Sequence, residues 1–351
     1  MKVLLTGALG YIGSAINHIL IQNGFSVVGV DLGLFTKACF YREDMWHSRA
    51  LMERLIRKDL RDVSSDDLQG CDAVVDFAGL ANDPSGELSS SWTEEINHQA
   101  SVRLAKLARE HGISRYLFAS SCSVYGSRSD RLLTEESSVE PVSEYAKAKV
   151  AVEREVLPLA NTRFFPTILR NATAYGASPR MRFDLVLNNL TAYAYTTGII
   201  KVFSDGTAWR PNVHVEDIAL AVLAILESPT DEVRGRIFNV GSDSENYQVR
   251  TMATMVSEIM PSCRIEAAPG AGKDPRSYRV SFRRLSALKS LVQKWNVRSG
   301  VDELKKAFEH NQLTYEMFQD PEYHNVKKIR ELISQGKFDS TLRFRVSQSS
   351  P

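Results

Sequence analysis

Two residues four positions apart, Tyr145 and Lys149, are spaced to carry acid–base chemistry. If their segment is helical, the two side chains share one face of the helix. A neighbouring ammonium group favours the phenolate of a tyrosine, so we expect the pKa of Tyr145 to fall from ~10 toward neutrality. The phenolate can then take a proton from a hydroxyl group while hydride leaves the same carbon. A tyrosine and a lysine also occur at this spacing by chance, so the pair gains meaning only from its surroundings.

A serine-rich stretch, SSCSVYG at residues 120–126, precedes this pair and follows a strand-like run. A serine hydroxyl at the end of that strand can orient the reacting group. Cys122 is a weak candidate for a nucleophile, because the sequence marks no histidine base near it. The alternative is two unrelated surface residues and a serine-rich loop.

A glycine-rich turn near the N-terminus predicts a binding site for a diphosphate. Residues 2–5 form an apolar, strand-like run, and residues 11–23 carry apolar side chains at helical spacing. Between them stand Gly7, Gly10 and Gly13. Backbone N–H groups and the dipole at the start of the helix attract an anion, and glycine lets the phosphates approach closely. Taken alone, the triplet also fits an ordinary tight turn.

Two carboxylates indicate which dinucleotide would bind. Asp31 ends the next apolar run, roughly 20 residues beyond the glycines, where it can accept hydrogen bonds from the adenosine ribose and repel a 2′-phosphate. This favours NAD over NADP. Asp59, in the segment KDLRD, is placed to accept a hydrogen bond from the adenine amino group. The alternatives are a cap or turn residue for Asp31 and a solvated acidic turn for Asp59.

Strands alternate with helices through the first half of the chain, which predicts an α/β fold with a doubly wound parallel sheet. Ligands in such sheets bind at the carboxyl ends of the strands. Five candidate residues fall at expected strand ends, namely Gly7, Asp31, Asp59, Gly79 and Ser121. We therefore expect them to meet in one crevice.

Length and composition are those of a globular enzyme. The 351 residues can bury a large core, and a net charge of +1 gives no general attraction to nucleic acid or to a membrane surface. We find no basic run, no signal peptide and no apolar stretch near the ~18 residues of a membrane span. The four cysteines form no CxxC pair, so we expect neither a metal site nor disulfides, and a cytoplasmic location.

Together these motifs resemble those of the extended short-chain dehydrogenases/reductases, in the nucleotide-sugar epimerase/dehydratase family. Order and spacing agree over roughly residues 1–240. The matching residues are Thr6, Gly7, Gly10, Gly13, Asp31, Asp59, Phe77, Ala78, Gly79, Asn97, Ser121, Tyr145, Lys149, Arg210, His214, Val215 and Asp217.

We expect a Rossmann domain at residues 1–175, to which residues 213–241 return. A smaller α/β substrate-binding domain is expected from residues 176–212 and 242–346, and a disordered tail at 347–351. In the resembled family two helices, here residues 99–111 and 145–157, form a four-helix dimer interface. The resemblance therefore implies a homodimer.

The resemblance also implies a role for each matched residue. Tyr145 would be the acid/base, Lys149 would hold the nicotinamide ribose, and Ser121 would bind the reacting oxygen. NAD would be held by Gly7, Gly10, Tyr11, Ile12, Gly13, Asp31, Asp59, Leu60, Phe77, Ala78, Gly79, Asn97, Ser120, Tyr145 and Lys149. A nucleotide-diphosphate sugar would be held by Asn82, Ser123, Thr173, Arg180, Arg182, Arg210 and Arg276.

Arg210 would pair with the substrate diphosphate, which suits a bidentate guanidinium. Arg276 lies in a basic strip where the resembled family often has a diphosphate-binding arginine, and Arg180 and Arg182 could meet a phosphate or a sugar carboxylate. For Arg180 and Arg182 the alternative is a solvated start of a helix. Asp217 is expected to cap the helix that it begins, with His214 packed beside it.

Two departures from the family pattern narrow the reaction. Sugar 4,6-dehydratases carry Asp and Glu directly after the serine or threonine, where this chain has Cys122 and Ser123. The family's phosphate-binding Asn is replaced by Thr173, and Asn171 is expected to belong to the turn. We therefore expect an NAD-dependent 4-epimerase, with a 4-keto-sugar reductase or a dehydrogenase as alternatives. A 4,6-dehydratase and a non-catalytic NAD sensor come behind these.

Overall fold

The computed structural model describes residues 1–35, 40, 43–272, 274 and 276–345, without the side chains of residues 43–46 and 128–130. The tail expected to be disordered, residues 347–351, lies outside the described residues, and so does Cys39. Within the described ranges no helix is long and apolar enough to cross a membrane. The same ranges hold no cluster of three His, Cys, Asp or Glu side chains suited to a metal ion.

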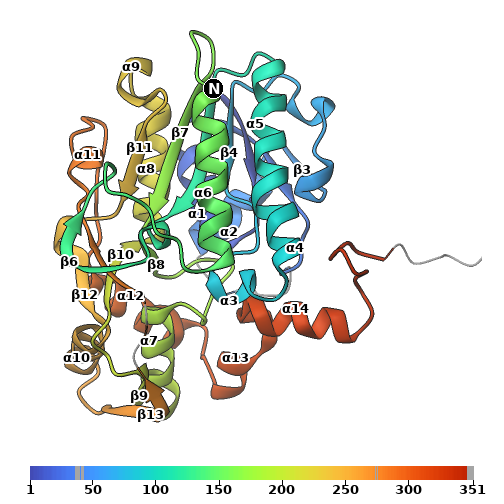
Figure 1. Cartoon of the computed structure of the whole chain (residues 1–351). Helices are drawn as coiled ribbons and strands as arrows, with labels where there is room; N and C mark the ends of the chain where they lie inside the picture. The colour runs from blue at the N-terminus through green and yellow to red at the C-terminus, as the bar shows by residue number, and fades with distance from the viewer. Residues whose placement is uncertain (36–39, 41–42, 273, 275, 346–351) are drawn as a thin grey trace, which may run out of the picture.

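A seven-stranded parallel sheet forms the centre of the molecule, in the order β11-β7-β5-β4-β1-β2-β3 (Figure 1). Its strands are β1 (Lys2–Thr6), β2 (Ser26–Asp31), β3 (Arg54–Arg57), β4 (Ala73–Asp76), β5 (Arg115–Ser121), β7 (Phe165–Asn171) and β11 (Ile237–Val240). The expected doubly wound parallel sheet is confirmed. The order of strands reverses direction beside β1, which is where ligands bind in such sheets.

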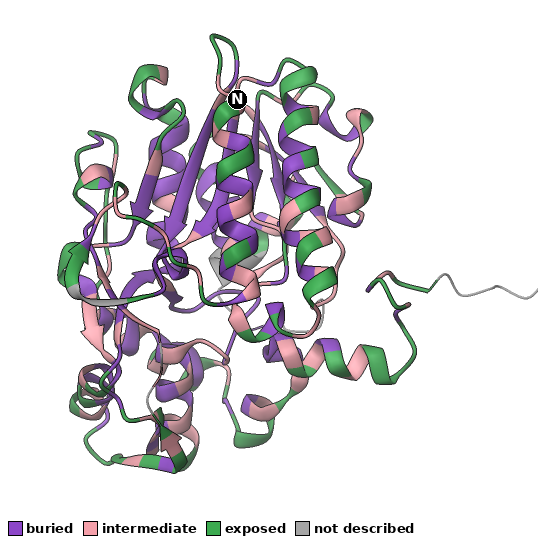
Figure 2. Ribbon diagram, viewed as in Figure 1, coloured by how far each residue is buried: buried purple, intermediate pink, exposed green. Residues whose placement is uncertain are grey.

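Helices cover both faces of this sheet because its strands are apolar on both sides. Val3 and Leu5 of β1 pack against α1 (Tyr11–Gln22) and α8 (Val215–Glu227). Leu4, between them, points the other way, into the cluster that contains α5 (Ala100–Glu110) and α6 (Glu144–Val156). The sheet is therefore largely buried apart from its edge strand β3, whereas α5 and α6 expose their outer faces (Figure 2).

The remaining helices are shorter or lie at the end of the sheet. A π-helical segment, Glu94–Gln99, leads into α5, so the expected helix 99–111 starts one residue later than predicted as an α-helix. The others are α2 (Glu43–Ala50), α3 (Asp83–Gly86), α4 (Ser90–Thr93), α7 (Val186–Thr197), α9 (Thr230–Val233), α10 (Val249–Ile259), α11 (Arg283–Ser286), α12 (Val297–His310), α13 (Tyr315–Gln319) and α14 (Asn325–Ser334).

Three small sheets, built mainly from the second half of the chain, lie at the left and the lower end of Figure 1. They pair β8 (Thr173–Tyr175) with β10 (Trp209–His214) and β12 (Asn246–Gln248), β9 (Ile199–Ser204) with β13 (Arg264–Gly272), and β6 (Ser127–Leu133) with β14 (Ser277–Val280). α8 and β11 return to the central sheet. The domain boundaries themselves stay a prediction.

The start of α8 differs in detail from the prediction. His214, not Asp217, is the N-cap, because the His214 ring accepts a hydrogen bond from the Glu216 amide. The Asp217 carboxylate instead accepts hydrogen bonds from the amides of Lys294 and Trp295. Both residues therefore have structural roles, as expected. His214 caps α8, whereas Asp217 holds the backbone of the residues that lead into α12.

Beyond α14 the chain crosses back to the N-terminal half. Phe338 and Leu342 are buried in a small apolar cluster with Leu80. The Trp92 indole N–H donates to the carbonyl of Ser340 at 2.8 Å. This C-terminal segment, residues 336–345, therefore lies against loops that follow β4, such as the one that carries Trp92, 248 positions before Ser340.

Candidate functional site

Two adjoining cavities open at the carboxyl ends of the central strands. The larger, about 620 Å³, is lined by Ser121, Tyr145 and Lys149, and is called here the Tyr145 cavity. The smaller, about 180 Å³, is lined by Gly7, Gly10 and Gly13, and is called the glycine-loop cavity. The two share the corner after β4, where Phe77, Ala78, Gly79 and Leu80 line both.

The glycine-loop cavity has the geometry of an anion site. Gly7 has a φ of +69°, and a Cβ there would lie 3.0 Å from the Phe77 carbonyl oxygen and the Ala78 amide. A Cβ on Gly13 would lie 2.0 Å from the carbonyl oxygen of Gly7. α1 then starts at Tyr11 with no side-chain cap and no acidic residue in its first turn. The positive end of α1 is thus free to meet a phosphate group.

Asp31 and Asp59 both line this cavity, as do Tyr11, Ile12 and Leu60. The Asp31 carboxylate accepts hydrogen bonds from the amides of Leu9 (3.0 Å) and Gly33 (2.7 Å), which hold it at the end of β2. Burial raises the pKa of Asp31. Its position is the one that sequence analysis gives to a ligand of the adenosine ribose.

Asp59 is held in a different way from that expected. Both carboxylate oxygens accept hydrogen bonds from the Arg61 guanidinium, and one also accepts from the Arg61 amide. Burial by itself raises the pKa of Asp59. The hydrogen bonds and the charge of Arg61 lower it by more, so the pKa of Asp59 lies below its usual value. Asp59 is therefore a charged partner of Arg61 as well as a wall of the cavity.

Arg61 ties the C-terminal segment to the same cavity. Its guanidinium also donates to the carbonyl oxygens of Thr341 (2.7 Å) and Leu342 (3.3 Å). The Leu342 side chain lines the cavity on the side of Asp59 and Leu60. Sequence analysis missed this wall, because nothing in residues 336–345 signals a contact about 280 positions away.

Asn97 does not line either cavity, in contrast to its predicted contact with NAD. Its side-chain amide donates to and accepts from the backbone of Leu80, at 2.9 and 2.7 Å. A Cβ on Gly79 would lie 2.8 Å from the Asn97 Oδ1. Asn97 thus fixes the backbone of the Gly79–Leu80 corner, and it would act on a ligand only through that corner.

The structure brings together the three residues predicted to react. Ser143 caps α6 by accepting a hydrogen bond from the Ala146 amide, which places Tyr145 in the first turn. Tyr145 is hydrogen-bonded to Ser121 at the end of β5. The Lys149 Nζ lies 5.5 Å from the Tyr145 ring centroid and 4.5 Å from that of Phe118. One helix and one strand end therefore hold the group.

The pKa of Tyr145 differs from the expectation. Burial raises it, and the nearby Asp83 carboxylate adds to this, whereas Arg182 and the Ser121 hydrogen bond lower it less strongly. Burial also lowers the pKa of Lys149 to about 8. In the protein without ligand, Tyr145 is consequently a neutral phenol, and Lys149 alone does not ionise it.

Behind this group lies a buried ion pair. The Ser120 hydroxyl donates to the Glu153 carboxylate, which also pairs with Arg170 at 2.6 Å. Ser120 lines the Tyr145 cavity but directs its hydroxyl into this pair. Cys122 is buried and its thiol donates to the Arg170 carbonyl, while burial raises its pKa, so it is no nucleophile here. Ser123 lines the cavity with a buried hydroxyl that has no partner.

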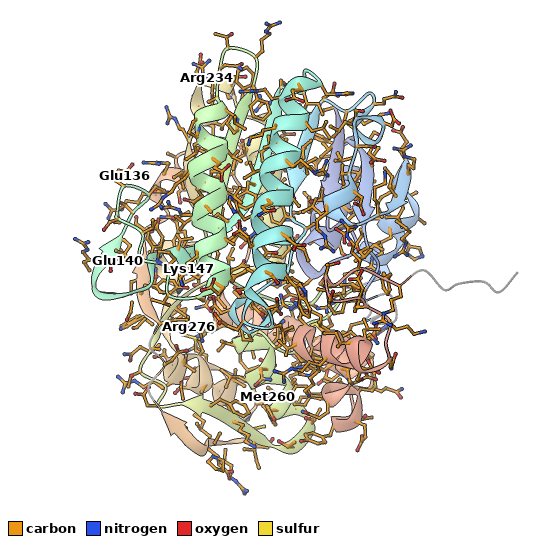
Figure 3. The ribbon with its side chains drawn as sticks, turned by 45° about the vertical axis from the view of Figure 1, so that its right-hand side comes forward. Glu136, Glu140, Lys147, Arg234, Met260 and Arg276 are labelled. Atoms are coloured by element: carbon orange, nitrogen blue, oxygen red, sulfur yellow. The ribbon has the colours of Figure 1, made fainter. Side chains whose placement is uncertain are left out.

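Arg210 and Arg276 enter the Tyr145 cavity from the second half of the chain. Both guanidinium groups pair with the Asp274 carboxylate, and Arg276 also pairs with Asp83 on α3. Figure 3 shows Arg276 below the end of α6 that carries Lys147. A diphosphate entering here would compete with Asp274 and Asp83 for the two cations.

The other predicted substrate contacts divide between the cavities. Asn82, Thr173 and Arg182 line the Tyr145 cavity. Arg182 also lines the glycine-loop cavity, and it pairs with Asp184 at 2.9 Å. Arg180 lines only the glycine-loop cavity and is 1% exposed, so it is neither a sugar-side residue nor a solvated helix start.

Asn171 also lines the Tyr145 cavity, with a buried Oδ1 that has no partner. Sequence analysis gave it only a place in the turn. Its position at the end of β7 was the signal that could have identified it, because each neighbouring strand end contributes to the cavity.

Comparison with known proteins gives this geometry a context. The model of the NAD dependent epimerase/dehydratase family matches residues 3–241. A UDP-glucose 4-epimerase of Corynebacterium glutamicum is 28% identical over 306 residues, covering 80% of this chain and 87% of its own length. A protein of Bacillus subtilis described as the uncharacterized UDP-glucose epimerase YtcB is 27% identical over 274 residues, covering 74% of this chain and 82% of its own.

Solved structures resemble the whole arrangement. MoeE5 in complex with UDP-glucuronic acid and NAD is 26% identical, with a TM-score of 0.73 over 89% of this chain and 100% of MoeE5. DesIV of Streptomyces venezuelae, a dTDP-glucose 4,6-dehydratase, has a TM-score of 0.76 over 89% of this chain and 98% of its own, at 21% identity, which shows a shared fold.

Proposed function

Because this chain belongs to the NAD dependent epimerase/dehydratase family, we propose that it is a nucleotide-sugar 4-epimerase that keeps NAD bound. The observation that carries the proposal is the triad of Ser121, Tyr145 and Lys149 in a cavity beside a glycine loop. The names of the relatives point to UDP-sugars as the substrate class.

The residues of the glycine-loop cavity fit NAD. The uncapped start of α1 suits its diphosphate, and Asp31 suits an unphosphorylated ribose. Bound there, NAD would supply the hydride acceptor and donor, and a positive ring that favours the Tyr145 phenolate.

The chain's own residues then manage a proton. Tyr145 takes the proton of the sugar C4 hydroxyl and later returns it, while the Ser121 hydroxyl orients the reacting oxygen. Lys149, charged below a pKa of about 8, stabilises the negative charge on Tyr145. Arg210 and Arg276 would exchange Asp274 for the substrate diphosphate.

The absence of a suitable acid–base pair next to Ser121 disfavours 4,6-dehydration. Cys122 is buried with a raised pKa, and Ser123 is a neutral hydroxyl. The Asp83 carboxylate, which lies close enough to Tyr145 to raise its pKa, is held by Arg276 and Ser143. Epimerisation needs no such pair, because the hydride returns to C4 and the proton returns to the oxygen bonded to C4.

We also propose a homodimer through α5 and α6, which lie side by side and expose their outer faces (Figures 1 and 2). A cytoplasmic location fits the three described cysteines, Cys71, Cys122 and Cys263, which are free thiols. Light scattering on the purified protein tests the dimer, and a mass of one chain would contradict it.

The experiment that tests the activity is NMR of a panel of UDP-, GDP-, CDP- and dTDP-sugars incubated with the purified protein without added cofactor. We expect interconversion of a pair of sugars that differ only at C4. A keto product that accumulates with reduced cofactor would identify a dehydrogenase instead, and turnover only with added NADH would identify a reductase.

A further inference from the structure

Arg180 is brought to the glycine-loop cavity by a segment that crosses the start of α1. The Tyr11 hydroxyl donates to the Gly176 carbonyl at 2.6 Å, and the Ser178 hydroxyl donates to the Tyr11 carbonyl at 2.7 Å. Residues 176–180 are thereby pinned to the first residue of α1. The Arg180 side chain then lines the same cavity as Gly7, Gly10 and Gly13.

The guanidinium of Arg180 lacks the partners that a buried cation needs. One terminal nitrogen donates to the Asn325 Oδ1 at 2.7 Å, and the group stacks on Phe35 with its central carbon 3.8 Å from the ring centroid. The buried Nε has no hydrogen-bond partner. Among the residues that the structure describes, no carboxylate lies within salt-bridge distance of it.

Other buried arginines near the cavities are neutralised. Arg170 pairs with Glu153, Arg182 with Asp184, and Arg210 with Asp274. Arg180 differs from these three arginines because its buried positive charge has no carboxylate partner among the described residues. Such a charge is costly to bury unless a ligand of opposite charge completes the site.

The electrostatics of the cavity favour a dianion. Burial and, to a lesser degree, the neighbouring Arg182 lower the pKa of Arg180, against the opposite effect of Asp184, Glu322 and Asp31, to a net value of about 9. The group is still charged at neutral pH. The uncapped N-terminus of α1 adds a second source of positive potential in the same cavity.

We propose that Arg180 binds the diphosphate of the dinucleotide, together with the glycine loop that lines the same cavity. The inference rests on the assignment of this cavity to NAD and adds a residue from the second half of the chain to the cofactor site. The unpartnered Nε donates to a phosphate oxygen, and the Phe35 ring keeps the guanidinium plane in place. The substrate diphosphate is the other possible anion, but Arg180 does not line the Tyr145 cavity where Arg210 and Arg276 lie.

The test is calorimetric titration of Arg180→Met, which keeps an unbranched apolar stem but removes the charged guanidinium, in the full chain freed of cofactor. We expect affinity for NAD and for ADP to fall about 10- to 100-fold, as for the loss of a hydrogen bond to a charged group. Affinity for adenosine, which has no phosphate, and for UDP should stay within about twofold of wild type. Arg180→Lys should recover part of the loss.

The matched control is Arg115→Met, at a half-buried arginine that bonds only the carbonyls of Ile225 and Ser228. It should bind NAD and ADP as wild type does. An equal loss for adenosine and ADP in Arg180→Met, or a loss for UDP alone, would overturn the proposal. If wild type binds neither NAD nor ADP, the assignment of the cavity fails before the arginine is tested.

Discussion

Lys149 should make the protein less stable than a variant that lacks its charge, although the proposed reaction needs it. The residue is 5% exposed, and burial lowers its pKa from 10.5 to about 8. At ~1.4 kcal/mol for each pKa unit, the charged form costs the folded state ~3 kcal/mol at pH 7. Lys149→Met removes that cost and also removes the cation–π contacts with Phe118 and Tyr145, worth ~1 kcal/mol. We expect a net gain of about 2 kcal/mol in the free energy of unfolding, with loss of turnover.

The pH dependence gives the sharper test. Between pH 8 and pH 10.5 the unfolded chain keeps the proton on Lys149 while the folded chain releases it, so wild-type stability rises with pH. The cost falls from ~3 kcal/mol at pH 7 to ~1.4 kcal/mol at pH 9.5. The stability difference between Lys149→Met and wild type should therefore shrink by roughly 2 kcal/mol over that range.

The assay is urea unfolding of the cofactor-free proteins at the two pH values. The control, Lys147→Met on the exposed face of α6, should stay close to wild type at both. A variant at Lys149 that is less stable than wild type at pH 7, or a difference that does not depend on pH, would refute the reasoning.

Three further outcomes follow from named contacts. Glu153→Gln leaves the Arg170 guanidinium buried without its counter-charge, so the free energy of unfolding in urea should fall by about 3–5 kcal/mol. A fall below ~1 kcal/mol would show that the pair is solvated. Arg210→Gln should weaken binding of UDP about 10- to 100-fold in calorimetry while leaving NAD affinity unchanged, and a matching loss for NAD would argue against separate sites. Leu342→Ala removes a side chain that lines the glycine-loop cavity, so it should speed the release of bound NAD several-fold in a dilution chase. The control Ile333→Ala, at an exposed residue, should release NAD as wild type does. Equal release rates for Leu342→Ala and wild type would exclude a role for the C-terminal segment.

Local sequence patterns predict the central parallel sheet and its first helix well. Residues 2–31 combine an apolar strand, a glycine turn and an amphipathic helix, and the structure has β1, α1 and β2 within a residue or two of the expected bounds. The alternation of strands and helices gives the parallel sheet, because a right-handed crossover is the short way to join parallel strands. Tyr145, Lys149 and Ser121 could be found from the sequence, because the first two have the spacing of one helix face and the third ends a strand.

Contacts between distant segments could not be predicted in the same way. Asn97 reads as a cofactor ligand by position, but its partner is the Leu80 backbone. Arg180 and Arg182 are two residues apart and look equivalent, yet Arg180 lines only the glycine-loop cavity, whereas Arg182 lines both cavities. The hydrogen bonds that pin this segment to Tyr11 join residues about 165 positions apart, which local patterns do not reveal. The pKa of Tyr145 depends on burial and on Asp83, neither of which the spacing of Tyr145 and Lys149 reveals.

The measurement that tests the central claim most directly compares Tyr145→Phe with wild type, each with its cofactor bound. Phenylalanine keeps the ring but removes the hydroxyl that is hydrogen-bonded to Ser121. The account predicts that the variant binds NAD and UDP as wild type does, while epimerisation of the UDP-sugar, followed by NMR, falls by at least about 100-fold. A variant that still interconverts the two sugars at a rate near wild type would contradict it.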